Sequence, residues 1–143
     1  MLALLLNLDL HLKWAGFTII LLGVSHAFFG PRFKWKEELA RLSLLNRQIF
    51  HVHNFFIAVV LVMLGLLCLL GTKALIEPTL LGRCFTGGVT LFWAMRLFFQ
   101  FFVYSADLWR GQKFETFIHY LFAFAWSYYT AVFGWAFGLQ MGA

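Results

Sequence analysis

The sequence contains 143 residues, of which 62% are hydrophobic, 20% aromatic and only 12% charged. A soluble domain usually has about 25% charged residues, so this composition excludes a disordered chain and an ordinary soluble fold. The formal charge of +5 does not indicate a nucleic-acid partner, because the basic residues lie between long apolar runs and suit contacts with a lipid bilayer instead. We therefore predict an integral membrane protein.

A helix needs about 20 apolar residues to cross the hydrocarbon core of a bilayer. The sequence contains four runs of this kind, and they are too long and continuous for the strands of a membrane barrel. We predict an all-α protein with four transmembrane helices in an antiparallel bundle, folded as a single domain over residues 1–143. The predicted spans cover about 14–30, 49–71, 84–106 and 117–139.

The first predicted span is flanked by two shorter helical segments. Leucines alternate with polar residues between Leu6 and Lys13, and we expect this segment to form an interfacial helix that continues into the span. Pro31 should end the span, because proline cannot continue a helix. Beyond it, apolar residues recur at helical spacing opposite charged ones, which predicts a short interfacial helix between the first and second spans, or a docking face for a partner subunit. These apolar residues are Trp35, Leu39, Leu42, Leu45 and Ile49.

The distribution of basic residues predicts the orientation. Lys and Arg accumulate in the short loops that stay in the cytoplasm. Residues 31–48 and 107–116 contain seven of them, the opposite side contains three, and the third span contains Arg96. We therefore expect these two loops in the cytoplasm and both termini on the non-cytoplasmic side, in a membrane such as the bacterial inner membrane.

Polar residues inside the third and fourth predicted spans fall on single helix faces. Ionisable side chains in a bilayer are costly, so each one suggests a functional role. At the start of the fourth span, Glu115 and His119 are four residues apart and therefore neighbours on the helix surface. They lead into a run of small residues from Ala123 to Gly138, which predicts a groove for close packing of another helix. A stripe in the third span comprises Trp93, Arg96, Gln100, Tyr104 and Asp107.

Small residues mark one face of each of the first two spans. Gly16, Gly23 and Gly30 recur every seven residues in the first span. The second span has a face that is polar at its cytoplasmic end and small beyond it. This face comprises Arg47, His51, Asn54, Ala58, Gly65 and Cys68. We expect Cys68 and Cys84 to be free thiols rather than a disulfide.

Three histidines on separate spans are predicted to lie at one depth, about a helical turn below the cytoplasmic surface. We interpret His51 and His119 as the principal ligands or donors of a cofactor site, and His26 as a third. Arg96 supplies the counter-charge. The complete candidate set is His26, His51, His119, Arg96, Gln100 and Tyr104.

Three ligand classes suit such a site. A b-type haem needs two histidines on facing helices, with Arg96 available for a propionate. A quinone headgroup needs a histidine donor to a carbonyl, an Arg or Tyr opposite, and an apolar slot. Both classes predict a small subunit of a redox chain that carries out electron transport. Alternatively, a metal-dependent membrane enzyme could hold Zn or Fe through four residues of suitable type. These residues are His26, His51, His119 and Glu115.

A non-catalytic role also fits the sequence. The interfacial helix and the small-residue groove of the fourth span could dock the chain into a larger membrane complex or a homo-oligomer. In that case the histidines would not bind a cofactor. The sequence leaves the redox subunit, the metal enzyme and the assembly subunit open.

Overall fold

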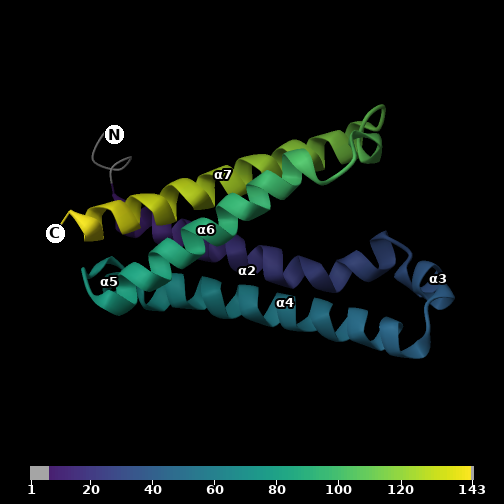
Figure 1. Cartoon of the computed structure of the whole chain (residues 1–143), viewed down its shortest axis with the longest axis horizontal. Helices are drawn as coiled ribbons and strands as arrows, with labels where there is room; N and C mark the ends of the chain where they lie inside the picture. Colours follow the sequence, from purple (N-terminus) through teal and green to yellow (C-terminus); the bar gives the residue numbers. More distant parts are fainter. Residues whose placement is uncertain (1–6, 143) are drawn as a thin grey trace. The chain divides into compact units, whose positions relative to one another are not determined.

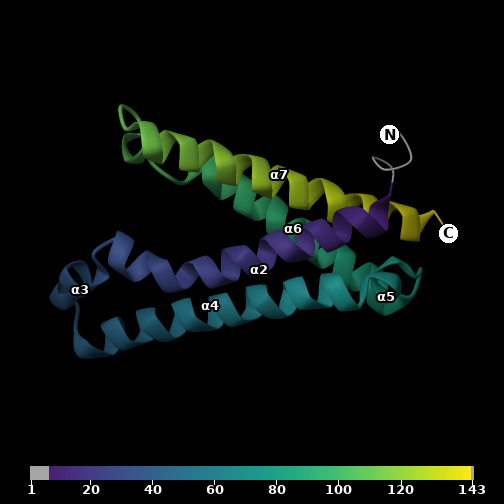
Figure 2. The same ribbon diagram turned by 180° about the vertical axis from the view of Figure 1, so that it is seen from behind.

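The computed structural model describes residues 7–142, and the regular secondary structure of that part is entirely helical, with no strand (Figures 1 and 2). This confirms the all-α prediction for the described residues. Two 3-10 turns, η1 (Leu39–Arg41) and η2 (Ala106–Leu108), lie between longer helices. The α-helices are α2 (Leu8–Arg32), α3 (Trp35–Glu38), α4 (Leu44–Leu70), α5 (Thr72–Ile76), α6 (Leu80–Phe102) and α7 (Lys113–Met141).

The chain forms two compact units. One contains residues 12–72 and is built from α2 and α4, which run side by side in Figures 1 and 2. The other contains residues up to His11 together with 73–143, and α6 packs against α7 within it. We call them the α2–α4 unit and the α6–α7 unit. That the two units form one four-helix domain stays a prediction.

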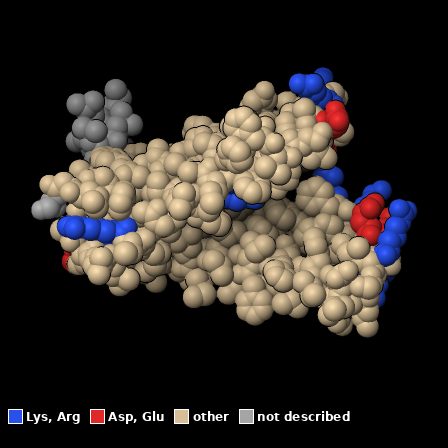
Figure 3. Space-filling view, viewed as in Figure 1, with Lys and Arg blue, Asp and Glu red and all other residues tan. Residues whose placement is uncertain are grey.

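Two of the described helices, α2 and α4, are long and apolar enough to cross a membrane. Only 28% and 17% of their most apolar windows are buried, whereas the core helix of a soluble protein would be mostly buried. Figure 3 shows charged side chains mainly near the ends of the helices, with an almost uncharged surface between them. These features support membrane association.

Close contact between α2 and α4 depends on small residues. A Cβ atom added at Gly16 would lie 2.7 Å from the Gly65 carbonyl oxygen, and one added at Gly23 would lie 3.0 Å from the Ala58 carbonyl oxygen. The spacing of seven residues in α2 therefore has a packing reason, because it places Gly16 and Gly23 against the small face of α4. Gly30 differs, since its nearest neighbour is the Trp35 ring of α3.

The segment between α2 and α4 corrects two predictions. α2 continues past Pro31 to Arg32, because proline disrupts the hydrogen bonding and packing of the turn before it rather than stopping the chain at its own position. The predicted continuous face from Trp35 to Ile49 is wrong. Leu42 is extended, with a ψ of 154°, so Leu45 and Ile49 belong to α4 and only Trp35–Arg41 forms the short connecting helix.

Ser43 determines where α4 begins. Its side chain accepts a hydrogen bond from the Asn46 backbone N–H at 3.4 Å, as a helix N-cap does. We expect Ser43→Ala to lower the free energy of unfolding by about 1 kcal/mol, because that N–H loses its acceptor. Denaturant unfolding in detergent micelles, followed by circular dichroism, measures this change. Equal stability of the variant and wild type would contradict the assigned cap.

The α6–α7 unit is fixed at one end by Gln140. Its Oε1 accepts from the Thr86 hydroxyl at 2.6 Å, and its Nε2 donates to the Leu75 and Glu77 carbonyl oxygens, both at 2.8 Å. Gln140 is only 1% exposed. This network joins α7 to the start of α6 and to the α5 connection, and satisfies buried polar groups that would otherwise be costly.

At its other end α6 stops at Phe102, four residues before the predicted end of the third span. The chain turns at Val103, and the Ser105 side chain then accepts from the Asp107 backbone N–H at 3.3 Å, which starts η2. The predicted stripe is therefore wrong beyond Gln100. Tyr104 and Asp107 follow the helix and do not share its face.

Candidate functional site

A chain of hydrogen bonds links α6 to α7 near the connection between them. The Trp126 indole N–H donates to Gln100 Oε1 at 3.2 Å. Gln100 Nε2 donates in turn to His119 Nδ1 at 2.8 Å, and lies 3.4 Å from the His119 carbonyl oxygen. All three side chains are buried, with exposed fractions of 3% to 7%.

This chain fixes the protonation of His119. An indole N–H can only donate, so the Gln100 amide must present its oxygen to Trp126 and its NH₂ to His119. His119 Nδ1 is then an acceptor and carries no proton. The ring is a neutral imidazole with its proton on Nε2, and Nε2 has no hydrogen-bond partner among residues 7–142.

Aromatic rings hold the imidazole in place. Trp109 stacks on His119 with ring centroids 3.8 Å apart and planes at 16°, and Phe101 meets it edge-on at 5.8 Å. The Thr116 hydroxyl donates to the Trp109 carbonyl oxygen at 2.7 Å, which ties the loop carrying Trp109 to the first turn of α7. His119 therefore offers one N–H donor in a rigid aromatic setting.

Arg96 lies one turn before Gln100 on α6. Its guanidinium carbon lies 5.2 Å from the centre of the Trp126 ring, within range of a cation–π interaction. No carboxylate of the described residues pairs with it, including Glu115 and Asp107. Among residues 7–142, Arg96 is thus a partly buried cation without an anionic partner, and burial of an unpaired charge is costly.

Trp126 also belongs to a cluster of aromatic rings with Trp93 and Tyr129. Trp93 stacks on Trp126 at 5.0 Å between centroids, and Tyr129 lies 4.8 Å from Trp93. The Trp93 indole N–H is buried and has no hydrogen-bond partner within the described part of the chain. We name the set Arg96, Gln100, Trp109, His119 and Trp126 the α6–α7 site.

The predicted cofactor residues fall into both units. Arg96, Gln100 and His119 lie in the α6–α7 unit. Arg96 and Gln100 both contact Trp126, and His119 is bonded to Gln100. Tyr104 also belongs to this unit, but its exposed side chain follows the end of α6. His26 and His51 belong to the α2–α4 unit. Their meeting with His119 stays a prediction.

His26 has the opposite ring arrangement from His119. Its Nδ1 lies 2.8 Å from the Leu22 carbonyl oxygen, which can only accept, so Nδ1 carries a proton and the lone pair of the neutral ring is on Nε2. His51 is exposed and has an edge-on contact with the Phe50 ring at 6.0 Å. His26 could therefore ligate a metal through Nε2, whereas His119 could not without a change of tautomer.

The metal hypothesis gains no support within either unit. Among the described residues, no group of three or more His, Cys, Asp or Glu side chains is placed to hold a metal ion. Of the four predicted ligands, His26 and His51 lie in one unit, and Glu115 and His119 in the other. Cys68 and Cys84 are free thiols, as expected.

Trp109 and Trp126 were not among the site residues predicted from the sequence. Trp126 follows His119 by seven residues, a spacing that places both on one helix face. The small-residue groove predicted for the fourth span lies on a neighbouring face of α7, of which Ser127, Ala131 and Gly138 are exposed. Trp109 gave no comparable signal, because its position depends on how the loop turns after α6.

Comparison with known proteins gives no match to this chain among family models, characterised proteins or solved structures.

Proposed function

We propose that this chain is a subunit of a membrane redox chain and that its α6–α7 site binds a quinone headgroup. The observation that carries the proposal is the hydrogen-bond chain from Trp126 through Gln100 to His119, which leaves the His119 Nε2–H as a donor. A quinone carbonyl oxygen is a hydrogen-bond acceptor that such a donor suits. Aromatic side chains around His119 provide surfaces for a flat ring.

Arg96 supplies the second feature that a quinone site needs. Reduction of a quinone places negative charge on its oxygens, and a cation without a partner in a dry setting stabilises that charge strongly. Arg96 and His119 both connect to Trp126, Arg96 directly and His119 through Gln100. We infer that the two donors act on the same headgroup.

The tautomer of His119 favours quinone over haem. A haem iron binds a ring nitrogen that carries a lone pair. In His119, Nδ1 already accepts from Gln100, and Nε2 bears the proton. Haem ligation would break the contact with Gln100 and leave the Trp126 N–H or the amide unsatisfied, at a cost of about 1–3 kcal/mol. Binding of a quinone carbonyl needs no such change.

We further propose that α6 and α7 cross the membrane together with α2 and α4, as four antiparallel spans. α6 has 23 residues and α7 has 29, enough to cross a hydrocarbon core of about 30 Å. Their exposed side chains include Phe98, Phe99, Phe117 and Phe124, an apolar surface that suits lipid rather than water. The loops at 31–48 and 107–116 face the cytoplasm in this proposal, as the positive-inside rule predicts.

Titration with a short-tailed benzoquinone tests the site. We expect saturable quenching of tryptophan fluorescence with one quinone per chain when the full chain is titrated in detergent micelles. His119→Ala should weaken the affinity about 10-fold, because a buried hydrogen-bond donor is lost. His119→Gln, which keeps an N–H donor at a similar reach, should recover part of that loss.

The control for this titration is His53→Ala. His53 is exposed on α4, and its Nδ1 bonds only to the Ile49 carbonyl oxygen, so the affinity should stay within about 2-fold of wild type. Equal affinities for wild type and His119→Ala would contradict the proposal. A Soret absorption band that disappears in His119→Ala would support haem instead of quinone.

A further inference from the structure

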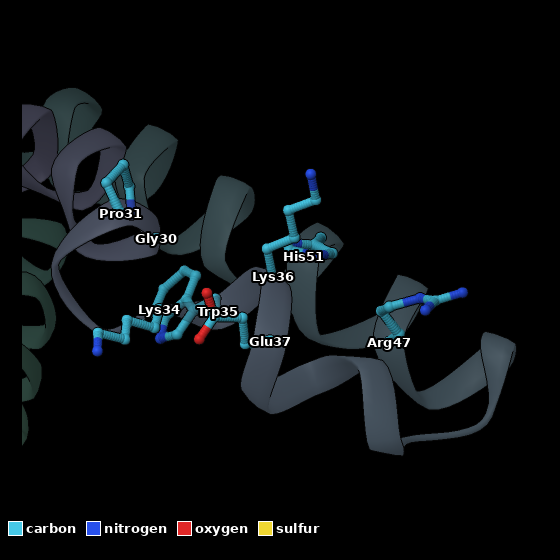
Figure 4. Close-up of a pocket in the computed structure, with 8 residues that line it drawn as sticks. All are labelled: Gly30, Pro31, Lys34, Trp35, Lys36, Glu37, Arg47 and His51. Carbon is cyan, nitrogen blue, oxygen red and sulfur yellow. The ribbon is translucent and has the colours of Figure 1, made fainter.

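A pocket of about 640 Å³ lies in the α2–α4 unit, where α2 ends and α4 begins (Figure 4). α3 crosses this end of the unit and supplies three of the eight lining residues, Trp35, Lys36 and Glu37. The pocket is lined by Gly30, Pro31, Lys34, Trp35, Lys36, Glu37, Arg47 and His51. Three lining residues are Lys or Arg and one is Glu, so the formal charge of the pocket is positive.

The backbone around Lys34 holds α3 across the pocket. Lys34 has a φ of 51°, in the left-handed region, which is uncommon for residues other than glycine. Its carbonyl oxygen accepts from the Glu37 and Glu38 backbone N–H groups, at 2.9 Å and 3.1 Å. This strained turn brings the short α3 helix back over the start of α4, where Trp35 meets the Phe50 ring edge-on at 4.7 Å.

The cations of the pocket are not neutralised within the described chain. Lys36 and Arg47 have no salt-bridge partner among residues 7–142. In Figure 4 the Glu37 carboxylate points to the opposite side from the Arg47 guanidinium. Arg47 and His51 are four residues apart on α4, so they are neighbours on its surface. The pocket therefore offers donors and positive charge to an anion from outside the chain.

The surroundings of the pocket favour a lipid as the source of that anion. Phe33, Leu44 and Leu45 have exposed fractions of 53% to 65%. Phe33 immediately precedes Lys34, and Leu44 and Leu45 lie in the turn of α4 before Arg47. The apolar sides of α2 and α4 continue from this end of the unit. A phosphate in the pocket could thus be attached to acyl chains that lie along the helices, and Trp35 is a residue type that prefers the interface.

We propose that this pocket binds the phosphate group of an anionic membrane lipid. Figure 4 shows the Lys36 ammonium and the Arg47 guanidinium pointing in different directions. In this proposal the two long, flexible side chains turn toward the bound phosphate and pair with its oxygens, as basic residues of lipid-binding pockets do. The proposal rests on the part of the proposed function in which α2 and α4 cross the membrane, and it is independent of the quinone.

Native mass spectrometry of the full chain in detergent micelles tests this proposal with phosphatidylglycerol and phosphatidylcholine as probes. We expect one phosphatidylglycerol bound per chain, at least about 10-fold more tightly than phosphatidylcholine. Lys36→Gln/Arg47→Gln should weaken phosphatidylglycerol binding about 30-fold, the combined effect of two basic residues. The matched control is Arg110→Gln/Lys113→Gln, which removes the same charge at exposed positions of the other unit and should change the affinity less than about 2-fold.

Several results would overturn the proposal. The two lipids could bind equally, or the two double variants could lose the same affinity, which would indicate diffuse charge rather than a pocket. Displacement of the lipid by an equal concentration of soluble glycerol phosphate would show that the site takes a free phosphate compound instead. Circular dichroism verifies that both double variants fold. Lys36→Gln alone provides a milder test, with an expected affinity for phosphatidylglycerol about 5-fold weaker than that of wild type.

The affinity for quinone should be unchanged in all of these variants, which separates this proposal from the quinone site.

Discussion

Replacing Gly65 by leucine is expected to destabilise the α2–α4 unit by about 3 kcal/mol or more, the upper part of the range for overpacked sites. A Cβ atom at position 65 would lie 2.5 Å from the Gly16 carbonyl oxygen and 2.5 Å from Ile20 Cγ1. The backbone oxygen cannot move without shifting α2 as a whole, so the helices must separate. Unfolding in mixed micelles of increasing sodium dodecyl sulfate content, followed by circular dichroism, measures the loss.

Gly88→Leu is the matched control for Gly65→Leu. Gly88 also lies inside a helix, α6, but a Cβ atom added there meets nothing within 4 Å. Leucine has a higher helix propensity than glycine, so this variant should be as stable as wild type or slightly more stable. Equal destabilisation by the two substitutions would contradict the close packing assigned to Gly65.

Gln100→Glu is expected to weaken quinone binding about 100-fold. A carboxylate at position 100 accepts from the Trp126 N–H but cannot donate to His119 Nδ1. His119 would then carry its proton on Nδ1, in contact with the carboxylate, and lose the donor at Nε2 or become an imidazolium. The quinone titration measures the affinity, and the ¹⁵N chemical shifts of histidine-labelled protein show the tautomer.

Two further variants, one a control and one a second test, accompany Gln100→Glu. Gln112→Glu makes the same change at an exposed residue before α7 and should leave the affinity within about 2-fold of wild type. Trp126→Phe removes the donor that orients the Gln100 amide and should weaken binding about 10-fold without adding a charge. Unchanged affinity in both Gln100→Glu and Trp126→Phe would contradict a role for the tautomer in binding.

The long helices could be predicted from the sequence because continuous apolar runs determine them. Their ends could not be located as well. α6 stops at Phe102 although Val103 and Tyr104 are compatible with a helix, and the Ser105 side chain then stabilises a turn that competes with it. In the segment after α2, the helical spacing of apolar residues correctly predicted a helix at Trp35 and Leu39. Ser43 then caps a new helix, so the predicted apolar face does not continue to Leu45. Local capping interactions outweighed periodicity at both positions.

The candidate site could be predicted in part. Arg96 and Gln100 share a helix face at a spacing of four, and His119 was found as an ionisable residue near a helix start. The contact between Gln100 and His119 could not be derived, because it depends on how α6 packs against α7. The tautomer of His119 depends in turn on Trp126. Chemical specificity therefore arises from pairings between helices, which periodicity in one helix does not determine.

Photolabelling with an azido-benzoquinone tests the quinone site most directly. The full chain in micelles is irradiated with the probe, with and without excess unlabelled benzoquinone, and the labelled peptides are mapped by mass spectrometry. We predict competable labelling of peptides from α6 and α7 that contain residues 96–101 and 117–126. Labelling confined to residues 12–72, or labelling that excess benzoquinone does not reduce, would contradict a quinone site between α6 and α7.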